Sequence, residues 1–357
     1  MEYIFKDVLD VKNGKNQREV ECPDGQYPIY GSGGVMGYAS DYICEADTVI
    51  IGRKGSINNP IYAEEPFWNV DTAFGLCAKK DILLPKYLFY FCIKFDFERL
   101  NRTVTIPSLT KSDLLKIKIQ VPSLDVQQEV IDKLTKIESI LNFRKQELKL
   151  LDELVRGRFV ELFGDPVSNS YGLPEATLPE LGVFGRGVSK HRPRNDPKLL
   201  GGDYPLIQTG DIANAGLYIT SYNSTYSEFG LKQSKMWEKG TLCITIAANI
   251  AKTAILEFDA CFPDSVVGFT ANERTNNIFI HYWFSFFQAI LESQAPESAQ
   301  KNINLKILSE LKVIVPEKER QNEFANFVHR IDKSKFRGLS MLTTMKSAYD
   351  QQTFIYP

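Results

Sequence analysis

Histidine is scarce in this 357-residue chain, with three in all, and the six cysteines form no Cys-x-x-Cys pair. These shortages argue against a zinc site, which needs Cys or His ligands at short spacings. The longest apolar run, Ile278 to Leu291, is about 14 residues, whereas a bilayer-spanning helix needs about 20. Met1 is followed by Glu2 and Tyr3, not by the basic start of a signal peptide. We therefore expect a cytoplasmic protein with reduced thiols, no metal and no membrane segment.

Charge of one sign is also lacking, because the formal net charge is -2. Acidic and basic residues are nearly equal in number within residues 1–122, and again within residues 164–316. A protein that binds nucleic acid without sequence preference carries a strongly basic surface. The composition argues against that class, and any contact with DNA has to come from local clusters.

What the chain does contain is a long amphipathic segment from Val121 to about Phe163. Its apolar residues recur in alternating steps of four and three, which is the heptad pattern of a coiled-coil seam. Polar helix-forming residues fill the remaining positions and solvate the far face. The pattern predicts one long helix with a partner along a narrow stripe. Its predicted seam positions are Val130, Leu134, Ile137, Leu141, Leu148 and Leu151.

A second copy of this segment lies near the end of the chain. The offset that places Pro122 on Pro316 and Gln127 on Gln321 continues through the heptads without a slip. Followed toward the N-terminus, it also aligns the apolar residues before each helix, which indicates an internal duplication. The predicted seam positions of the second helix are Val328, Ile331, Leu342 and Met345.

The order of the pieces predicts the topology. Each globular head is followed by its own helix, so the second helix has to run back toward the first head, antiparallel to the first helix. We expect an α+β fold with two similar, mixed β-rich heads held apart by the two helices, with pseudo-twofold symmetry. The predicted divisions are 1–122 and 164–316 for the heads and 123–163 and 317–357 for the helices.

Both heads read as short strands separated by tight turns of Gly and Pro. Tyr27-Pro28-Ile29 matches Tyr204-Pro205-Leu206, and the segment from Asp47 to Ser56 matches that from Gly240 to Lys252. Between these two matches the second head is longer, roughly from Asn214 to Lys235. We therefore expect one shared fold with different loops.

These residues resemble the DNA-specificity subunits of type I restriction-modification systems, over nearly the whole chain. The resemblance depends on the duplicated string from Ile106-Pro107-Ser108-Leu109 to Gln127, repeated at Asn302 to Gln321. Two further matches support it, the loop Gly52-Arg53-Lys54-Gly55-Ser56 and the connector Phe163-Gly164-Asp165-Pro166.

The resemblance implies a non-catalytic reader of double-stranded DNA with no cofactor of its own. In this family each head is a target-recognition domain for one half of a split site. The helices set the gap and dock two methyltransferase subunits and, through them, restriction subunits. The seam spans roughly 37 Å by the helix rise, close to the roughly 34–36 Å of one turn of B-DNA. Because the loops differ, we expect an asymmetric bipartite target.

Candidate DNA contacts lie in the loops, and each has a plainer alternative. Arginine can pair bidentately with guanine or a phosphate, and asparagine can read adenine. The same cations in a solvated turn need no ligand, and the Gly31-to-Gly34 and Gln208-to-Asp211 segments are more simply interpreted as hairpin turns. The candidates are Ser32, Arg53, Lys54, Ser56, Lys190, Arg192, Arg194, Gln208, Thr209, Asn249 and Lys252.

Two other functions fit parts of the sequence. Asn59-Pro60-Ile61-Tyr62 resembles the Asn-Pro-Pro-Tyr signature of adenine methyltransferases but has Ile at the third position. No Gly-rich loop follows a strand and opens a helix, as cofactor binding requires. A methyltransferase with its own reader is therefore the weaker alternative. A coiled-coil scaffold whose near-neutral heads bind protein is the other.

Overall fold

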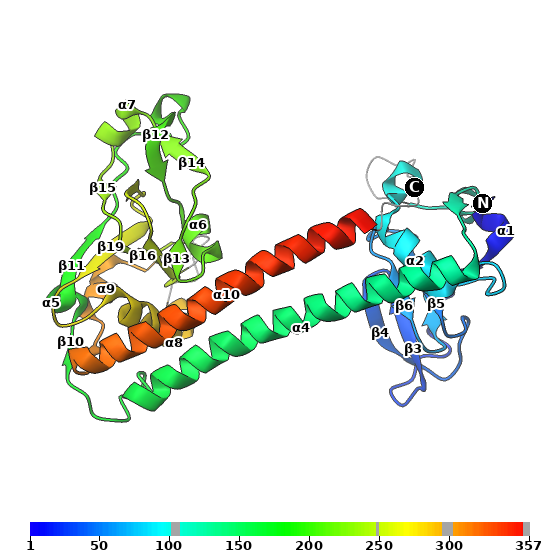
Figure 1. Ribbon diagram of the computed structural model, residues 1–357, viewed down its shortest axis with the longest axis horizontal. Coiled ribbons are helices and arrows are strands. Elements are labelled where there is room, and N and C mark those ends of the chain that lie inside the picture. The colour runs from blue at the N-terminus through cyan, green and yellow to red at the C-terminus, as the bar shows by residue number, and fades with distance from the viewer. Residues whose placement is uncertain (101–107, 248–249, 295–302, 353–357) are drawn as a thin grey trace. The chain divides into compact units, whose positions relative to one another are not determined.

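The computed structural model describes residues 1–100, 108–247, 250–294 and 303–352. The chain divides into two compact units, Met1–Gln146 with Leu339–Pro357, and Glu147–Gly338. Each unit contains one β-rich head and parts of both long helices, α4 (Leu124–Phe163) and α10 (Lys318–Gln352) (Figure 1). The predicted α+β class, with an internal repeat and two long helices, is confirmed.

In the first unit a four-stranded sheet has the order β2-β8-β5-β6, and a three-stranded sheet the order β4-β3-β7. Strand β5 is buried along its whole length, because Thr48 and the three aliphatic residues after it fill both faces. The head elements are β1 (Glu2–Ile4), α1 (Phe5–Val8), β2 (Leu9–Asn13), β3 (Tyr27–Gly31), β4 (Gly34–Ala39), β5 (Thr48–Gly52), β6 (Ile61–Ala63), β7 (Trp68–Asn69), β8 (Ala73–Ala78), α2 (Pro85–Lys94), a 3-10 turn (Phe97–Leu100), α3 (Lys111–Leu114) and β9 (Lys118–Gln120).

The second unit repeats this plan with one strand more in each of the two sheets. Its main sheet has the order β11-β19-β16-β17-β13, and the smaller sheet the order β14-β12-β18-β15. The elements are β10 (Glu175–Ala176), α5 (Leu178–Leu181), β11 (Gly182–Arg186), a 3-10 turn (Pro197–Leu199), β12 (Leu200–Leu206), α6 (Thr209–Asn214), β13 (Tyr218–Ile219), β14 (Ser224–Tyr226), α7 (Glu228–Lys232), β15 (Met236–Trp237), β16 (Leu242–Thr245), β17 (Thr253–Leu256), β18 (Ala260–Cys261), β19 (Val266–Ala271), α8 (Asn277–Gln294), α9 (Leu305–Glu310) and β20 (Val313–Ile314).

A buried glutamine joins each long helix to its head. The Gln127 side chain donates to the carbonyl of Pro122 at 2.9 Å and accepts from the backbone N–H of Leu84 at 2.8 Å. Gln321 does the same at its own helix start, donating to Pro316 at 2.8 Å and accepting from the Thr275 hydroxyl at 2.9 Å. Both side chains are fully buried, so the duplication extends to a hydrogen-bonded joint.

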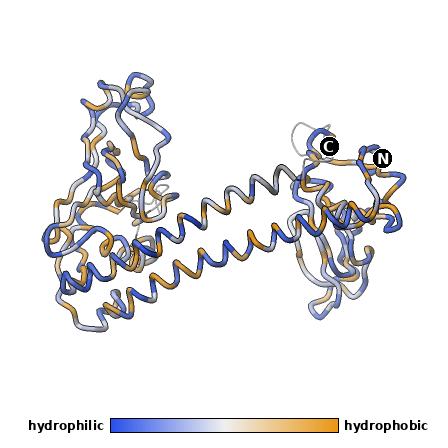
Figure 2. The backbone as a smooth tube through the Cα atoms, viewed as in Figure 1, coloured by the Kyte–Doolittle hydropathy of each residue, from blue (hydrophilic) through white to orange (hydrophobic). Residues whose placement is uncertain are grey.

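Within each unit α4 and α10 run antiparallel. In the first unit Tyr349 donates to Glu138 at 2.9 Å, and Arg144 contacts the sulfur of Met341 at 3.6 Å. In the second unit Arg158 pairs with Glu323 at 2.6 Å, and Lys335 pairs with Asp152. Residue numbers rise along α4 as they fall along α10, as the order of the pieces predicted. Apolar and polar residues alternate along both helices (Figure 2).

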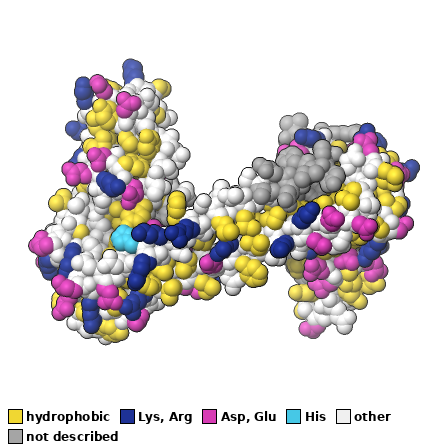
Figure 3. Space-filling model, in the orientation of Figure 1, with side chains coloured by type: hydrophobic (Ala, Val, Ile, Leu, Met, Phe, Trp, Pro, Cys, Tyr) yellow, Lys and Arg dark blue, Asp and Glu magenta, His cyan; other side chains and the backbone are white. Residues whose placement is uncertain are grey.

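Each unit has its own hydrophobic core, which includes one end of α4. Leu134 belongs to the core of the first unit, and Phe159 and Phe163 to that of the second. Gly164 follows α4 at φ +75°, the left-handed conformation that ends a helix. Acidic and basic side chains are interspersed over the visible face (Figure 3).

Among the described residues, no helix combines the length and the hydropathy needed to cross a membrane. Within those same parts of the chain, no group of three or more His, Cys, Asp or Glu side chains could hold a metal ion.

Candidate nucleic-acid interface

The loop after β5 holds its backbone in place and exposes its cations. The N–H of Arg53 donates to the Thr72 carbonyl at 2.7 Å, and the Arg53 carbonyl accepts from Leu109 at 2.9 Å. Arg53, Lys54 and Ser56 are exposed, and the Arg53 guanidinium lies 5.7 Å from the centre of the Phe74 ring. A fixed backbone with outward cations is suited to contacting a charged ligand.

Ser32 lies against this loop, although the two are distant in sequence. It belongs to the two-residue turn between β3 and β4, where Gly31 pairs with Gly34. A Cβ placed on Gly52 would lie 2.9 Å from the Ser32 Cβ and 2.3 Å from the Ser56 carbonyl oxygen. Glycine at position 52 is therefore required for this close approach, which brings Ser32, Arg53, Lys54 and Ser56 into one cluster.

The matching loop of the second unit follows β16. The Ile246 carbonyl accepts from the N–H of Ile303 at 3.0 Å, which repeats the bond between Arg53 and Leu109. Lys252 is half-buried, and its N–H donates to the Thr245 hydroxyl at 3.0 Å. Asn249 lies outside the described residues, as do Ile106, Pro107 and Asn302 of the duplicated string. The two loops therefore share a backbone frame and differ in side chains.

The basic cluster from Lys190 to Arg194 carries less free charge than its sequence indicates. Arg192 pairs with Asp264 at 3.4 Å, and Arg194 pairs with the same carboxylate. His191 lies 2.8 Å from Asp196, whose pKa is lowered by the N–H of Lys198 and by that imidazole. Lys190 is exposed. A phosphate here would compete with Asp264 for both guanidinium groups.

Gln208 and Thr209 stand at the start of a helix. Gln208 is the N-cap residue of α6, and its N–H donates to the Asp211 carboxylate at 2.8 Å. The hairpin turn preferred for this segment is therefore wrong, because the carboxylate three residues on favours a helix start. Gln208 is exposed and Thr209 is half-buried.

Four of the predicted seam positions belong to or pack on the cores, Val130 and Leu134 in the first unit and Val328 and Ile331 in the second. Leu134 and Val328 are buried, each 1% exposed. Val130, Ile137, Leu141, Leu148, Leu151, Ile331, Leu342 and Met345 are half-buried. Gly338 occupies one seam position, and a Cβ there would lie 3.5 Å from Leu148 Cδ2.

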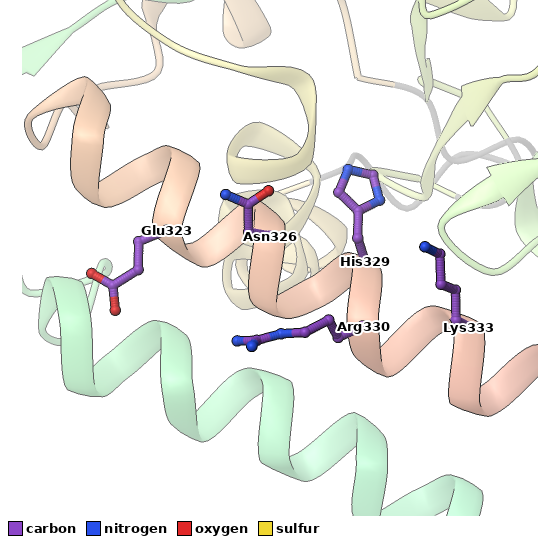
Figure 4. A pocket seen from close by; sticks show the side chains of 5 residues that line it. All are labelled: Glu323, Asn326, His329, Arg330 and Lys333. Atoms are coloured by element: carbon purple, nitrogen blue, oxygen red, sulfur yellow. The ribbon is translucent and has the colours of Figure 1, made fainter.

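Sequence reasoning missed a polar surface on α10. Glu323, Asn326, His329, Arg330 and Lys333 border a groove in the second unit (Figure 4). The imidazole of His329 stacks on Tyr218 of β13, with Nδ1 at 3.3 Å from the hydroxyl. Burial, together with Asp332 and Glu257, raises the pKa of Tyr218 to about 12. The cations in this part of α10 are a signal in the sequence. The sequence does not show that Tyr218 of β13 packs against His329.

Comparison with known proteins identifies the family. The model of the type I restriction modification DNA specificity domain matches residues 1–152 and 180–337. These two matches cover most of the chain. It therefore belongs to that family and contains the domain twice, which confirms the resemblance seen in the sequence.

Individual relatives are distant. A putative type I restriction enzyme specificity subunit of Methanocaldococcus jannaschii is 20% identical over 274 residues, 72% of this chain and 63% of that protein. A putative type I specificity subunit of Mycoplasma pneumoniae is 24% identical over 148 residues, 39% of this chain and 48% of that protein. The matches thus span between about half and two thirds of these relatives.

Solved structures share the fold. The S subunit of a type I restriction-modification system from M. genitalium aligns with a TM-score of 0.64 at 18% identity, over 99% of this chain and 94% of that one. A chain from a study of complex assembly and conformational transition of the type I R-M system aligns with a TM-score of 0.54 at 12% identity. The alignment covers 99% of this chain and 96% of that one.

Proposed function

We propose that this chain is a non-catalytic DNA-specificity subunit that reads an asymmetric bipartite site in double-stranded DNA. The observation that carries the proposal is the repeated backbone bond from Leu109 to Arg53 and from Ile303 to Ile246. It gives both units the same frame for a loop at the end of a buried strand. Different side chains on that frame are what two unlike half-sites require.

The proposal assigns target recognition to residues 1–122 and 164–316, and spacing to the helical segments 123–163 and 317–357. Ser32, Arg53, Lys54 and Ser56 form the candidate contact surface of the first unit. In the second unit the candidates are Lys190, Arg192, Arg194, Gln208, Thr209, Asn249 and Lys252.

The proposed partners are two methyltransferase subunits and, through them, restriction subunits, in the cytoplasm. Leu150 and Leu154 favour a protein partner on α4, because these two aliphatic side chains are 55% and 50% exposed. Exposed aliphatic residues on adjacent turns of one helix face are typical of an interface core. Replacing both with Asp is expected to prevent co-purification with the methyltransferase subunit.

The test is a selection from random-sequence DNA by the complex of this chain with its methyltransferase subunits. We expect two short, different sequence blocks separated by a fixed gap of about one helical turn. A chimaera that takes residues 1–122 from another family member is expected to change one block and leave the other intact.

If the selection enriches no sequence, a protein scaffold would be favoured instead. Methylation of DNA by the isolated chain with S-adenosylmethionine would contradict the non-catalytic assignment.

A further inference from the structure

In the second unit α10 borders a groove that no DNA-contact prediction included. One part is lined by Glu323, Asn326, His329, Arg330 and Lys333. The lining of the adjoining part includes Tyr218, Ile255, Ile278, Asn326 and His329. Asn326 and His329 belong to both, so the two parts form one surface, which we call the α10 groove. In Figure 4 His329 and Lys333 extend to one side of α10, whereas Glu323 extends toward α4 and Arg330 lies between α10 and α4.

The α10 groove has a positive balance. Arg330 and Lys333 are exposed, and in the described parts of the chain neither makes an ion pair. The carboxylate of Glu323 is compensated, because Arg158 lies 2.6 Å from it. Asp332 is half-buried, and burial raises the pKa of its carboxyl, an effect that Lys335 partly offsets. Figure 3 shows a run of Lys and Arg side chains beside a His side chain in this region.

The lining suits a phosphate backbone better than a protein surface. Asparagine amides and an imidazole supply further hydrogen-bond donors around the two cations, as phosphodiester oxygens require. A stable protein interface has an apolar core. The apolar residues in this lining offer little surface, since Ile255 is 5% and Ile278 is 9% exposed.

The corresponding face of α4 lacks this combination of two cations with amide and imidazole donors. The duplication places Asp132 at the position of Asn326, Thr135 at His329, Lys136 at Arg330 and Ser139 at Lys333. Asp132 accepts a hydrogen bond from Gln128 at 2.8 Å. Strand β13, which supplies Tyr218, has no counterpart in the sheets of the first unit within the described residues. The groove is therefore specific to the second unit, and α4 provides a matched control.

We propose that the α10 groove binds the sugar-phosphate backbone of DNA beside the half-site read by the second unit, through Arg330 and Lys333, without reading bases. This inference rests on the proposed function of the chain. It adds a positioning contact on the spacer helix, next to a head in which Asp264 pairs with both Arg192 and Arg194.

The experiment uses the complete complex with methyltransferase subunits and the double variant Arg330→Ala/Lys333→Ala. Binding to the selected site and to a scrambled duplex is measured from 50 to 200 mM salt. We expect both affinities to fall by about tenfold at the lower salt, with an unchanged ratio between them. The slope of log K against log salt should decrease in size by about 2, because about 0.9 counterions are released per phosphate contact.

Two further variants make the result specific. Lys136→Ala on α4 removes a cation at the position matching Arg330 and should leave affinity and slope unchanged. Arg330→Lys/Lys333→Arg keeps both charges and should retain the wild-type slope. Unchanged unfolding of the Ala variant would show that the helix is intact.

Other outcomes would overturn the inference. An unchanged salt slope in the Ala variant, with wild-type selection of the bipartite site, would show that the groove does not contact DNA while the reader function stands. Loss of methyltransferase subunits from the complex would make the groove a protein interface. A changed ratio between selected and scrambled DNA would indicate base reading. If the wild-type complex selects no bipartite site, the proposed function itself fails.

Discussion

The two units share a sheet order but differ at the connection that leaves β3 and β12. In the first unit a two-residue turn returns directly to β4, and Ser32 in that turn lies against the loop of Arg53. In the second unit the chain passes through α6 and β13 before β14 pairs with β12. The added strand extends the main sheet and reaches α10 through Tyr218.

The comparison of the two units separates residues that stabilise the fold from residues that are candidates for DNA contact. Features found in both units hold the heads to the helices, as the buried glutamines do. The loops differ between the units. Arg53 and Lys54 are exposed to solvent in the first unit. Arg192 and Arg194 pair with Asp264 in the second unit. Shared positions are therefore expected to affect stability, and unshared ones target choice.

The largest effect should come from the shared joint. Gln127→Ala or Gln321→Ala removes a fully buried amide and leaves backbone groups without partners, so we expect the unit concerned to lose about 2–4 kcal/mol of stability. Hydrogen exchange measured separately over the two cores would check this. Gln128→Ala is the control, because its exposed side chain bonds only Asp132 among the contacts described. A loss confined to one of the two joints would contradict their equivalence.

A smaller effect is expected from the unshared loops. If Arg53 contacts a base, Arg53→Ala should relax the preference at one position of one half-site by about 1–3 kcal/mol. Lys252→Ala, at the matching loop, should weaken binding without changing the sequence preference. Selection experiments with both variants measure this contrast. Equal relaxation of both half-sites by Arg53→Ala would show that the heads do not act independently.

The smallest expected effect concerns pH. His281 in α8 accepts or donates a hydrogen bond at 2.9 Å with the Thr253 hydroxyl, and burial lowers its pKa to about 4. The unfolded chain, with a His pKa of about 6.5, therefore binds more protons between pH 6.5 and 4, so the second unit loses stability as pH falls through this window. A full pKa shift would lower the free energy of unfolding by ~3 kcal/mol. Because His281 stays partly exposed, we expect a loss of about 1–2 kcal/mol instead.

The first unit offers the matched replacement, because the duplication places Tyr87 at the position of His281. His281→Tyr should flatten the pH dependence of the second unit, measured by hydrogen exchange at pH 4.5 and 7. A slope that persists in this variant would assign the titration to another group.

The sequence predicted the long helices well because their signals are local and repeated. Heptad spacing fixed the helix faces, and Gly164 marked the end of α4, where it adopts φ +75°. The pairing of Gln127 with Gln321 in the duplication pointed to equivalent positions, although their hydrogen bonds became visible only in the structure.

The site was harder to predict because its contacts join distant residues. Asp264 neutralises Arg192 and Arg194 from 72 and 70 residues away, a link that no local pattern reveals. The match with the Gly31 segment predicts a turn at Gln208, whereas in the structure the Asp211 carboxylate accepts from the Gln208 N–H and a helix begins there. The α10 groove depends on Tyr218, which lies 111 residues before His329.

The bond between Tyr349 and Glu138 has a consequence for how the protein is made. These residues are 211 positions apart, and Tyr349 also packs on the core of the first unit, where Lys94 lies 5.7 Å from its ring centre. At roughly 5–20 residues per second, a ribosome needs about 10–40 s to travel between them. The first unit therefore completes this packing only after Tyr349 has been translated. A chain terminated before that residue would lack the contact, so the stability of the first unit reports whether synthesis has passed Tyr349.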